Sequence, residues 1–135
     1  MESFKEMQAR YYAKHEATRA EYEGKQGIYA ITCNDNIVYV GKSTDLFKRF
    51  VAHEMNAFEP TERDYNTMKY RELREAALAG NKISFTVLEY TTDLDNRESY
   101  WIDKYYPALN RMIPSTHSTK KVENIKNFWA QRDKE

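Results

Sequence analysis

The sequence contains a single cysteine, Cys33, so no disulfide can form within one chain, and the composition suits a reducing compartment. It also lacks any apolar run long enough to span a bilayer, and the N-terminus shows no signal-peptide pattern. We therefore expect a protein without membrane association in the cytoplasm of a bacterium or of a phage-infected host cell.

An excess of one charge is missing as well. Lys and Arg total 21, Asp and Glu total 21, and the formal net charge is zero. A strongly basic chain is the usual electrostatic signature of nucleic-acid binding, so any such surface here must be local. What the chain does have is a 41% hydrophobic and 14% aromatic composition with eleven tyrosines. This is enough for a hydrophobic core, and 135 residues favour one domain with an appendage.

Three segments follow from the patterning. Residues 1–25 are expected to form a helix that docks on the core through a thin aromatic stripe, and residues 26–113 form the core. Residues 114–135 form a loop and a short basic helix. Within the core, the hydrophobic periods and turn residues predict the order β-β-α-α-β-α. The fold class is therefore α+β, with a small three-stranded antiparallel sheet flanked by helices and an extra helix at each terminus.

More detailed boundaries can be read from the same signals. We expect a strand ending near Cys33, a turn, a second strand, and a helix capped by Ser43 or Thr44. A polar loop at 56–65 and a helix at 66–79 come next, followed by a strand at 82–90 and a helix that begins at Asp93 and ends before Pro107.

The hairpin segment GIYAITCNDNIVYVGKS carries a tyrosine in each strand. A three-residue loop at 34–36 pairs Ile31 with Tyr39 and Tyr29 with Gly41, which places both phenols on one face. A two-residue loop places them on opposite faces, because a one-residue slip turns every side chain over. From these residues alone, cross-strand aromatic packing and a shared polar site both remain open.

Polar residues also occur on the helix that follows the hairpin. The segment GKST at 41–44 lacks the glycine that a nucleotide-binding P-loop needs five residues earlier, so Lys42 is interpreted as a cation at a helix entry, available to a phosphate or simply exposed. Arg49 and His53 are four residues apart and stack on one side of the helix. Arg49 is interpreted either as a phosphate ligand or as a rim residue, and His53 either as a site residue or as a satisfied core histidine.

Glu98 interrupts the apolar stripe of the last core helix, and a carboxylate is rarely buried without a partner. Its partner is predicted to be either a basic side chain such as Arg49 or a hard cation such as Mg²⁺, which keeps most of its waters. Asn110 follows the same helix and either orients a ligand or caps a turn. In the basic tail, Lys120, Lys121 and Lys126 are candidate phosphate contacts, and Phe128 and Trp129 are expected to dock the helix.

Taken together, these residues resemble the GIY-YIG nuclease superfamily. The resemblance rests on Gly27-Ile28-Tyr29, on Tyr39-Val40-Gly41, and on four later residues that follow in the family's order, namely Arg49, His53, Glu98 and Asn110. It implies a three-stranded antiparallel sheet and hydrolysis of DNA phosphodiesters at one divalent metal ion, Mg²⁺ or Mn²⁺.

The resemblance also implies roles for these residues. It makes Glu98 the metal ligand, Tyr29 the general base, Tyr39 a second active-site tyrosine and Arg49 the cation at the scissile phosphate. His53 becomes a supporting polar residue, and Asn110 a residue that holds the site together. Both tyrosines should then face one site, which favours the odd-length loop.

The expected partner is DNA, in a small stand-alone nuclease of phage or restriction type. No separate DNA-binding domain is recognisable, and the oligomeric state, including a homodimer, is left open. A non-catalytic binding module on a nuclease fold is the competing function, and the intact set of polar residues argues against it.

Overall fold

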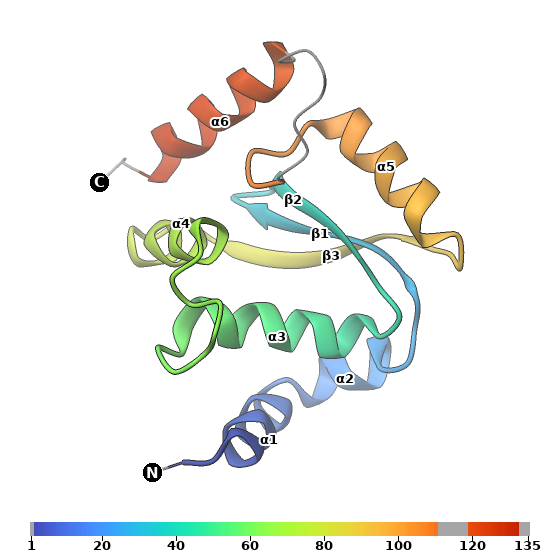
Figure 1. Cartoon of the computed structure of the whole chain (residues 1–135), viewed down its shortest axis with the longest axis vertical. Coiled ribbons are helices and arrows are strands. Elements are labelled where there is room, and N and C mark those ends of the chain that lie inside the picture. The colour runs from blue at the N-terminus through green and yellow to red at the C-terminus, as the bar shows by residue number, and fades with distance from the viewer. Residues whose placement is uncertain (1, 111–118, 133–135) are drawn as a thin grey trace.

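The computed structural model describes residues 2–110 and 119–132, which form nine helices and strands (Figure 1). None of the helices in these two ranges is both long and apolar enough to cross a membrane. In chain order the elements are α1 (Phe4–Lys14), α2 (Glu16–Tyr22), β1 (Gly27–Cys33), β2 (Asn36–Ser43), α3 (Leu46–Phe58), α4 (Met68–Leu78), β3 (Ile83–Tyr90), α5 (Leu94–Tyr105) and α6 (Thr119–Arg132).

The three strands form one antiparallel sheet in the order β2-β1-β3, with β1 in the centre. In Figure 1, α3 lies along one face of the sheet and α5 along the other. The order and type of the core elements confirm the α+β class with a three-stranded antiparallel sheet. The helix of the tail is Thr119–Arg132, and its start lies near the predicted one.

The hairpin between β1 and β2 differs from the expected three-residue loop. Asn34 and Asp35 form a two-residue turn in which both φ angles are positive, 51° and 70°. Such a turn alone would send the two tyrosines to opposite faces. A β-bulge reverses this, because Thr32 pairs with Ile37 while Ile31 pairs with Tyr39, leaving one extra residue in β2. The prediction of the loop length was wrong, and the predicted pairing of Tyr29 with Gly41 is present.

Each face of the sheet buries its own apolar cluster. On the α3 side, Tyr29 and Ile31 pack with Leu46 and Phe50 of α3 and with Leu73 of α4. On the α5 side a smaller cluster consists of Ile28, Val40 and Ile102, with Leu88, Leu94 and Trp101 packed against it. Because β1 alternates between two buried faces, all seven of its residues are buried, as expected of a central strand.

The N-terminal segment forms two helices rather than one. Ser3 caps α1 through a reciprocal capping box with Glu6, and His15 separates the two helices, as the C-cap of α1 and the N-cap of α2. Met7 and Tyr11 are buried against α3, as the aromatic stripe predicts. Phe4 belongs to the same predicted stripe but is 54% exposed, so the stripe docks only from its second turn onward.

The start of α3 also differs from the expectation. Neither Ser43 nor Thr44 caps this helix; Asp45 does, by accepting a hydrogen bond from the Lys48 amide at 3.1 Å. Ser43 instead bonds the backbone of Asp45, donating to its carbonyl at 2.7 Å and accepting from its N–H at 3.0 Å. The two residues together fix the direction in which α3 leaves the sheet.

Among its described side chains, Phe128 and Asn124 dock helix α6 on the core. Phe128 is buried in the α3-side cluster, and the Asn124 amide donates to the carbonyls of Tyr105 and Tyr106 at 2.6 and 2.9 Å. These carbonyls end α5, so Asn124 supplies partners that the helix terminus otherwise lacks. The Lys126 side chain is exposed. The side chains of Lys120, Lys121 and Trp129 lie outside the described residues, and the predictions made for them stay predictions.

Candidate active site

Tyr29 and Tyr39 project from the same face of the hairpin. Their ring centroids are 6.3 Å apart, and Tyr29 is fully buried while Tyr39 is partly exposed. The hydroxyl end of the Tyr29 ring lies against Gly41, its partner across the strands, where a Cβ atom would fall inside van der Waals contact with the phenol. The glycine of Tyr-Val-Gly is therefore required by the tyrosine of Gly-Ile-Tyr.

We expect Gly41→Ala to damage both stability and the site. The added methyl group has to displace the Tyr29 ring, and overpacking of a buried position costs about 2 kcal/mol, which lowers the Tm by roughly 5–10 °C. Differential scanning calorimetry measures the change. Gly24→Ala is the matched control, because no atom lies within 4 Å of its Cβ position and its positive φ of 75° penalises only the backbone. If Gly41→Ala is as stable and as active as the parent, the ring does not need the glycine.

His53 connects Tyr29 of β1 with Tyr70 of α4. Its Nε2 atom lies 2.5 Å from the Tyr29 hydroxyl, and its Nδ1 atom lies 2.8 Å from the hydroxyl of Tyr70. The imidazole is only 2% exposed, so it is a buried histidine with a partner on each ring nitrogen. His53 is therefore satisfied within the core, and its role as a site residue stays a prediction that its contact with Tyr29 supports.

Burial shapes the protonation of these groups. It raises the pKa of Tyr29 well above its usual value, with a further increase from Tyr39, and the Arg49 charge opposes both. The pKa of Tyr39 is also raised, first by burial and then by the Glu98 carboxylate. Burial, Lys69 and Arg49 all hold the pKa of His53 well below its usual value. At neutral pH the phenols and the imidazole are therefore uncharged.

Two cations flank the phenols. Arg49, in the first turn of α3, is exposed, and its charge acts to lower the pKa of both Tyr29 and Tyr39. Lys69, in the first turn of α4, holds its Nζ 4.4 Å from the Tyr39 ring centroid and 4.6 Å from that of Tyr70.

Sequence reasoning missed Lys69 and Tyr70. One signal was available, because Tyr70 lies on the apolar stripe of α4 with Leu73 and Ala76, where a phenol needs a hydrogen-bond partner. That partner is His53, on another helix, and spacing along the chain does not reveal a contact between two helices.

Glu98 lies on α5 with its side chain 24% exposed, and its cationic partner is Lys42 rather than Arg49. Lys42 Nζ is 4.0 Å from a Glu98 oxygen and makes a closer ion pair with Asp95, one turn earlier on α5. The pKa of Glu98 is raised by burial, and the Lys42 charge opposes this increase. The Arg49–Glu98 ion pair considered from the sequence is absent from the ion pairs of the described residues.

An open groove of about 630 Å³ lies beside these charges. It is bounded by the N-terminal ends of α3 and α5, where backbone N–H groups and the helix dipoles favour anions. Its walls are Lys42, Ser43, Thr44, Arg49, Thr92, Asp93, Leu94, Asp95 and Asn96. The charged residues of its lining are two cations, Lys42 and Arg49, and two carboxylates, Asp93 and Asp95.

Asn110 acts on the edge strand β2. Its amide donates to the Val40 carbonyl at 2.8 Å and accepts from the Val40 N–H at 2.8 Å, as a neighbouring strand would. The neighbouring Leu109 N–H donates to the carbonyl of Val38 at 2.8 Å. Asn110 therefore holds the strand that carries Tyr39 and Gly41, and the ligand-orienting role considered from the sequence stays a prediction.

The donor atoms present suit a weakly held hard cation. Among the described residues, no three His, Cys, Asp or Glu side chains come together to form a metal cage. A single half-sheltered carboxylate, Glu98, beside an open groove matches the way Mg²⁺ binds, through one or two carboxylates, substrate oxygens and water. Lys42 forms an ion pair with Glu98, so a metal ion at this carboxylate has to bind beside the lysine or displace it.

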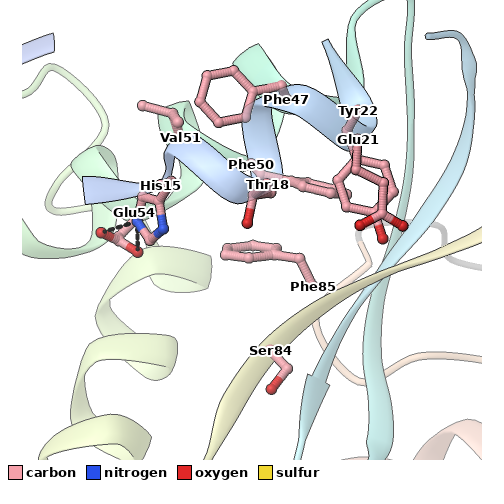
Figure 2. Close-up of a pocket in the computed structure, with 10 residues that line it drawn as sticks. All are labelled: His15, Thr18, Glu21, Tyr22, Phe47, Phe50, Val51, Glu54, Ser84 and Phe85. Atoms are coloured by element: carbon pink, nitrogen blue, oxygen red, sulfur yellow. Dashed lines mark hydrogen bonds and ion pairs between the residues drawn. The ribbon is translucent and has the colours of Figure 1, made fainter. Parts of the chain in front are cut away.

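A second cavity, of about 350 Å³, lies away from these residues, between α2, α3 and β3 (Figure 2). His15 there contacts the Glu54 carboxylate at 3.0 and 3.1 Å, and Phe50 stacks on Phe85 at 5.1 Å. Arg49 and Glu54 are five residues apart on α3 and so face about 140° away from each other. The cavity therefore belongs to the packing of the N-terminal helices on the sheet, on the side of α3 opposite to Arg49.

Comparison with known families identifies the core domain. A model described as the GIY-YIG catalytic domain matches residues 25–112, which is more than half of the chain. Searches of curated proteins and of solved structures give no match. The matched segment contains both strands of the hairpin, α3 and α5, and all six polar positions named from the motif.

Proposed function

The chain belongs to the GIY-YIG nuclease superfamily, and on this premise we propose that it is a DNA endonuclease that hydrolyses phosphodiester bonds at one divalent-metal site. The observation that carries the proposal is the convergence of Tyr29, Tyr39, Arg49 and Glu98. The charges of Arg49 and Glu98 both act on the two phenols, although the four residues come from two strands and two helices.

Arg49 and Lys42 bind the substrate in this proposal. Both line the groove between the N-termini of α3 and α5, where a DNA strand can lay its phosphates along the two helix ends. A guanidinium can donate two parallel hydrogen bonds to the non-bridging oxygens of one phosphate and stabilise the charge that grows there. Lys42 exchanges its contact with Asp95 for a phosphate oxygen.

Tyr29 and Tyr39 handle the proton of the attacking water. Tyr29 is the general base of the proposal, and its high pKa means that it must give up its own proton before it can accept another. Tyr39 lies next to it and is partly exposed, so it connects the buried phenol with the open side of the site. Arg49 lowers the pKa of both groups and so favours the phenolate.

Glu98 holds the divalent ion, Mg²⁺ or Mn²⁺. When bound, such an ion acts as a Lewis acid on the scissile phosphate and its leaving oxygen. Glu98 contributes one oxygen ligand, and the buried side of α5 fixes its position.

Incubation of supercoiled plasmid with the protein tests the proposal. We expect relaxed or linear products with Mg²⁺ or Mn²⁺ and none with excess EDTA. The same reaction with an Arg49→Ala variant serves as the control against a contaminating nuclease. A purified, folded parent that binds DNA but leaves plasmid intact with either metal would instead support a non-catalytic module on this fold.

The basic tail is proposed to add phosphate contacts. Phe128 and Asn124 dock α6, so replacing Lys120, Lys121 and Lys126 together with Gln should leave thermal stability near that of the parent. Each lost phosphate contact lowers the slope of log K against log salt by about one. Fluorescence anisotropy with labelled duplex DNA in EDTA, between 50 and 200 mM salt, measures that slope and is expected to show weaker binding with a shallower dependence.

A second variant separates position from net charge. Replacing Lys5, Lys14 and Arg19 with Gln removes three positive charges from α1 and α2, at the other end of the chain. We expect this variant to keep the slope of the parent. Equal slopes for the parent and the tail variant would remove the tail from the DNA interface.

A further inference from the structure

A buried imidazole lies between two buried phenols at the centre of the site. His53 Nε2 is 2.5 Å from the Tyr29 hydroxyl, and Nδ1 is 2.8 Å from the Tyr70 hydroxyl. The exposed fractions of Tyr29, His53 and Tyr70 are 1%, 2% and 5%. Buried polar groups of this kind have to satisfy one another, so the direction of each hydrogen bond is fixed by the protons available.

The protons can be counted. A neutral imidazole has one N–H and one lone pair in its ring plane. Burial and the positive charges of Lys69 and Arg49 hold the pKa of His53 far below its usual value, so the ring is neutral at pH 7. One of the two phenols must therefore donate to His53, and the other must accept from it.

The surroundings of the two phenols differ in a way that decides between these arrangements. Tyr29 lies next to a second phenol, that of Tyr39, whose ring centroid is 6.3 Å away and which is partly exposed. Tyr29 can therefore accept from His53 and donate to Tyr39.

Tyr70, in contrast, lies beside a cation, because the Lys69 Nζ is 4.6 Å from its ring centroid. Among the hydrogen bonds of the described residues, its hydroxyl pairs with Nδ1 of His53 at 2.8 Å. The acceptor left for the Tyr70 proton is Nδ1 of His53.

We propose that Tyr70 is a positioning residue that donates to Nδ1 of His53, fixes the imidazole in its Nε2–H tautomer and makes His53 a hydrogen-bond donor to the Tyr29 oxygen. This inference rests on the proposed nuclease function for its catalytic meaning. A donor on the Tyr29 oxygen stabilises the negative charge left when Tyr29 passes its proton to Tyr39 and Tyr39, which is partly exposed, releases its own hydroxyl proton to water. In the opposite arrangement, His53 would collect that proton and become a buried cation.

The opposite arrangement is disfavoured by the charges nearby. An imidazolium at position 53 would add a third positive charge to those of Lys69 and Arg49, both of which already lower its pKa. It would also be formed away from water, where an unpaired charge is costly. His53 therefore supports Tyr29 as a neutral donor and is not the final acceptor of the proton.

Nitrogen-15 NMR of the labelled protein at pH 7 reads the tautomer directly. We expect His53 to show a protonated Nε2 and an unprotonated Nδ1, in a signal that is assigned by its loss in His53→Asn. An Nδ1–H tautomer in the parent overturns the proposal. The measurement needs no DNA or metal, so a parent with the expected tautomer but no cleavage refutes the nuclease function and leaves the hydrogen-bond assignment in place.

Tyr70→Phe tests the positioning role. Without a donor at Nδ1, both tautomers become similar in free energy, and the two nitrogen shifts should move towards an average. We expect kcat to fall about tenfold with KM for DNA unchanged, because an interaction of the chemical step is lost rather than one of binding. A variant that keeps the single Nε2–H tautomer and the parent kcat would show that Tyr70 does not position His53.

Tyr11→Phe is the matched control. Tyr11 is also a largely buried tyrosine, and its hydroxyl donates to Glu59 at 2.7 Å, remote from the site. Loss of either hydroxyl should lower the Tm to a similar extent, since each removes one buried hydrogen bond. Only Tyr70→Phe should change the His53 shifts and kcat, and an equal loss of kcat in Tyr11→Phe would overturn the specific role of Tyr70.

Discussion

We expect Glu98→Gln to reduce DNA cleavage by at least about a thousandfold and to leave the fold intact. The amide is nearly isosteric but has no negative charge to hold a divalent cation. A bound ion contributes several kcal/mol to the transition state, and each 1.4 kcal/mol is a factor of ten in rate. The Glu98 carboxylate is 24% exposed, and its ion pair with Lys42 is long, at 4.0 Å. Loss of its charge should therefore change the Tm little.

Asp103→Asn is the matched control, because it makes the same chemical change at an exposed position of α5. Mn²⁺ binding, followed by electron paramagnetic resonance, gives a readout that does not depend on cleavage. We expect weaker Mn²⁺ binding in Glu98→Gln and binding like that of the parent in Asp103→Asn. If Glu98→Gln cuts plasmid as fast as the parent, Glu98 is not the metal ligand.

Tyr29→Phe should lower kcat by about a hundredfold to ten-thousandfold, the usual contribution of a general base, with little change in KM for DNA. The phenyl ring keeps its contact with Gly41 and its edge-to-face contact with Phe50 at 5.6 Å, so the packing stays. What is lost is the hydroxyl that His53 contacts at 2.5 Å.

Stability separates this role from a packing role. Leaving one buried group without its partner costs about 1–3 kcal/mol, so the Tm should fall by several degrees while the variant remains folded. Tyr11→Phe again provides a variant with a similar loss of Tm and unchanged cleavage. Full activity in Tyr29→Phe would leave cross-strand packing as the sole role of this phenol.

The order and type of the core elements and the six motif positions were accessible from the sequence because their signals are local. Alternation of apolar residues marks β3, the Asn34-Asp35-Asn36 turn separates β1 from β2, and the family pattern names residues at fixed places along the chain. The N-cap of α3 shows the limit of local reasoning, since Ser43, Thr44 and Asp45 are all good capping residues and only the path of the chain selects Asp45.

Contacts between elements were harder to predict. The partner of Glu98 is set by how α5 crosses β2, which brings Lys42 rather than Arg49 to the carboxylate. Tyr70 and Lys69 reach the site because α4 packs beside α3, and the motif does not include them. In both cases the missing information is the tertiary arrangement of two elements that are individually well predicted.

The bulge at Val38 imposes a rule of parity on this hairpin. With the two-residue turn alone, Tyr39 would face Ala30 and Val40 would face Tyr29; with one extra residue, Gly41 faces Tyr29 instead. Turn and bulge can therefore change in length only as a pair. A single insertion or deletion in either one turns every side chain of the strand beyond it to the other face of the sheet. The Val38 carbonyl accepts the Leu109 N–H, so the residue that sets this parity is also anchored beside Asn110.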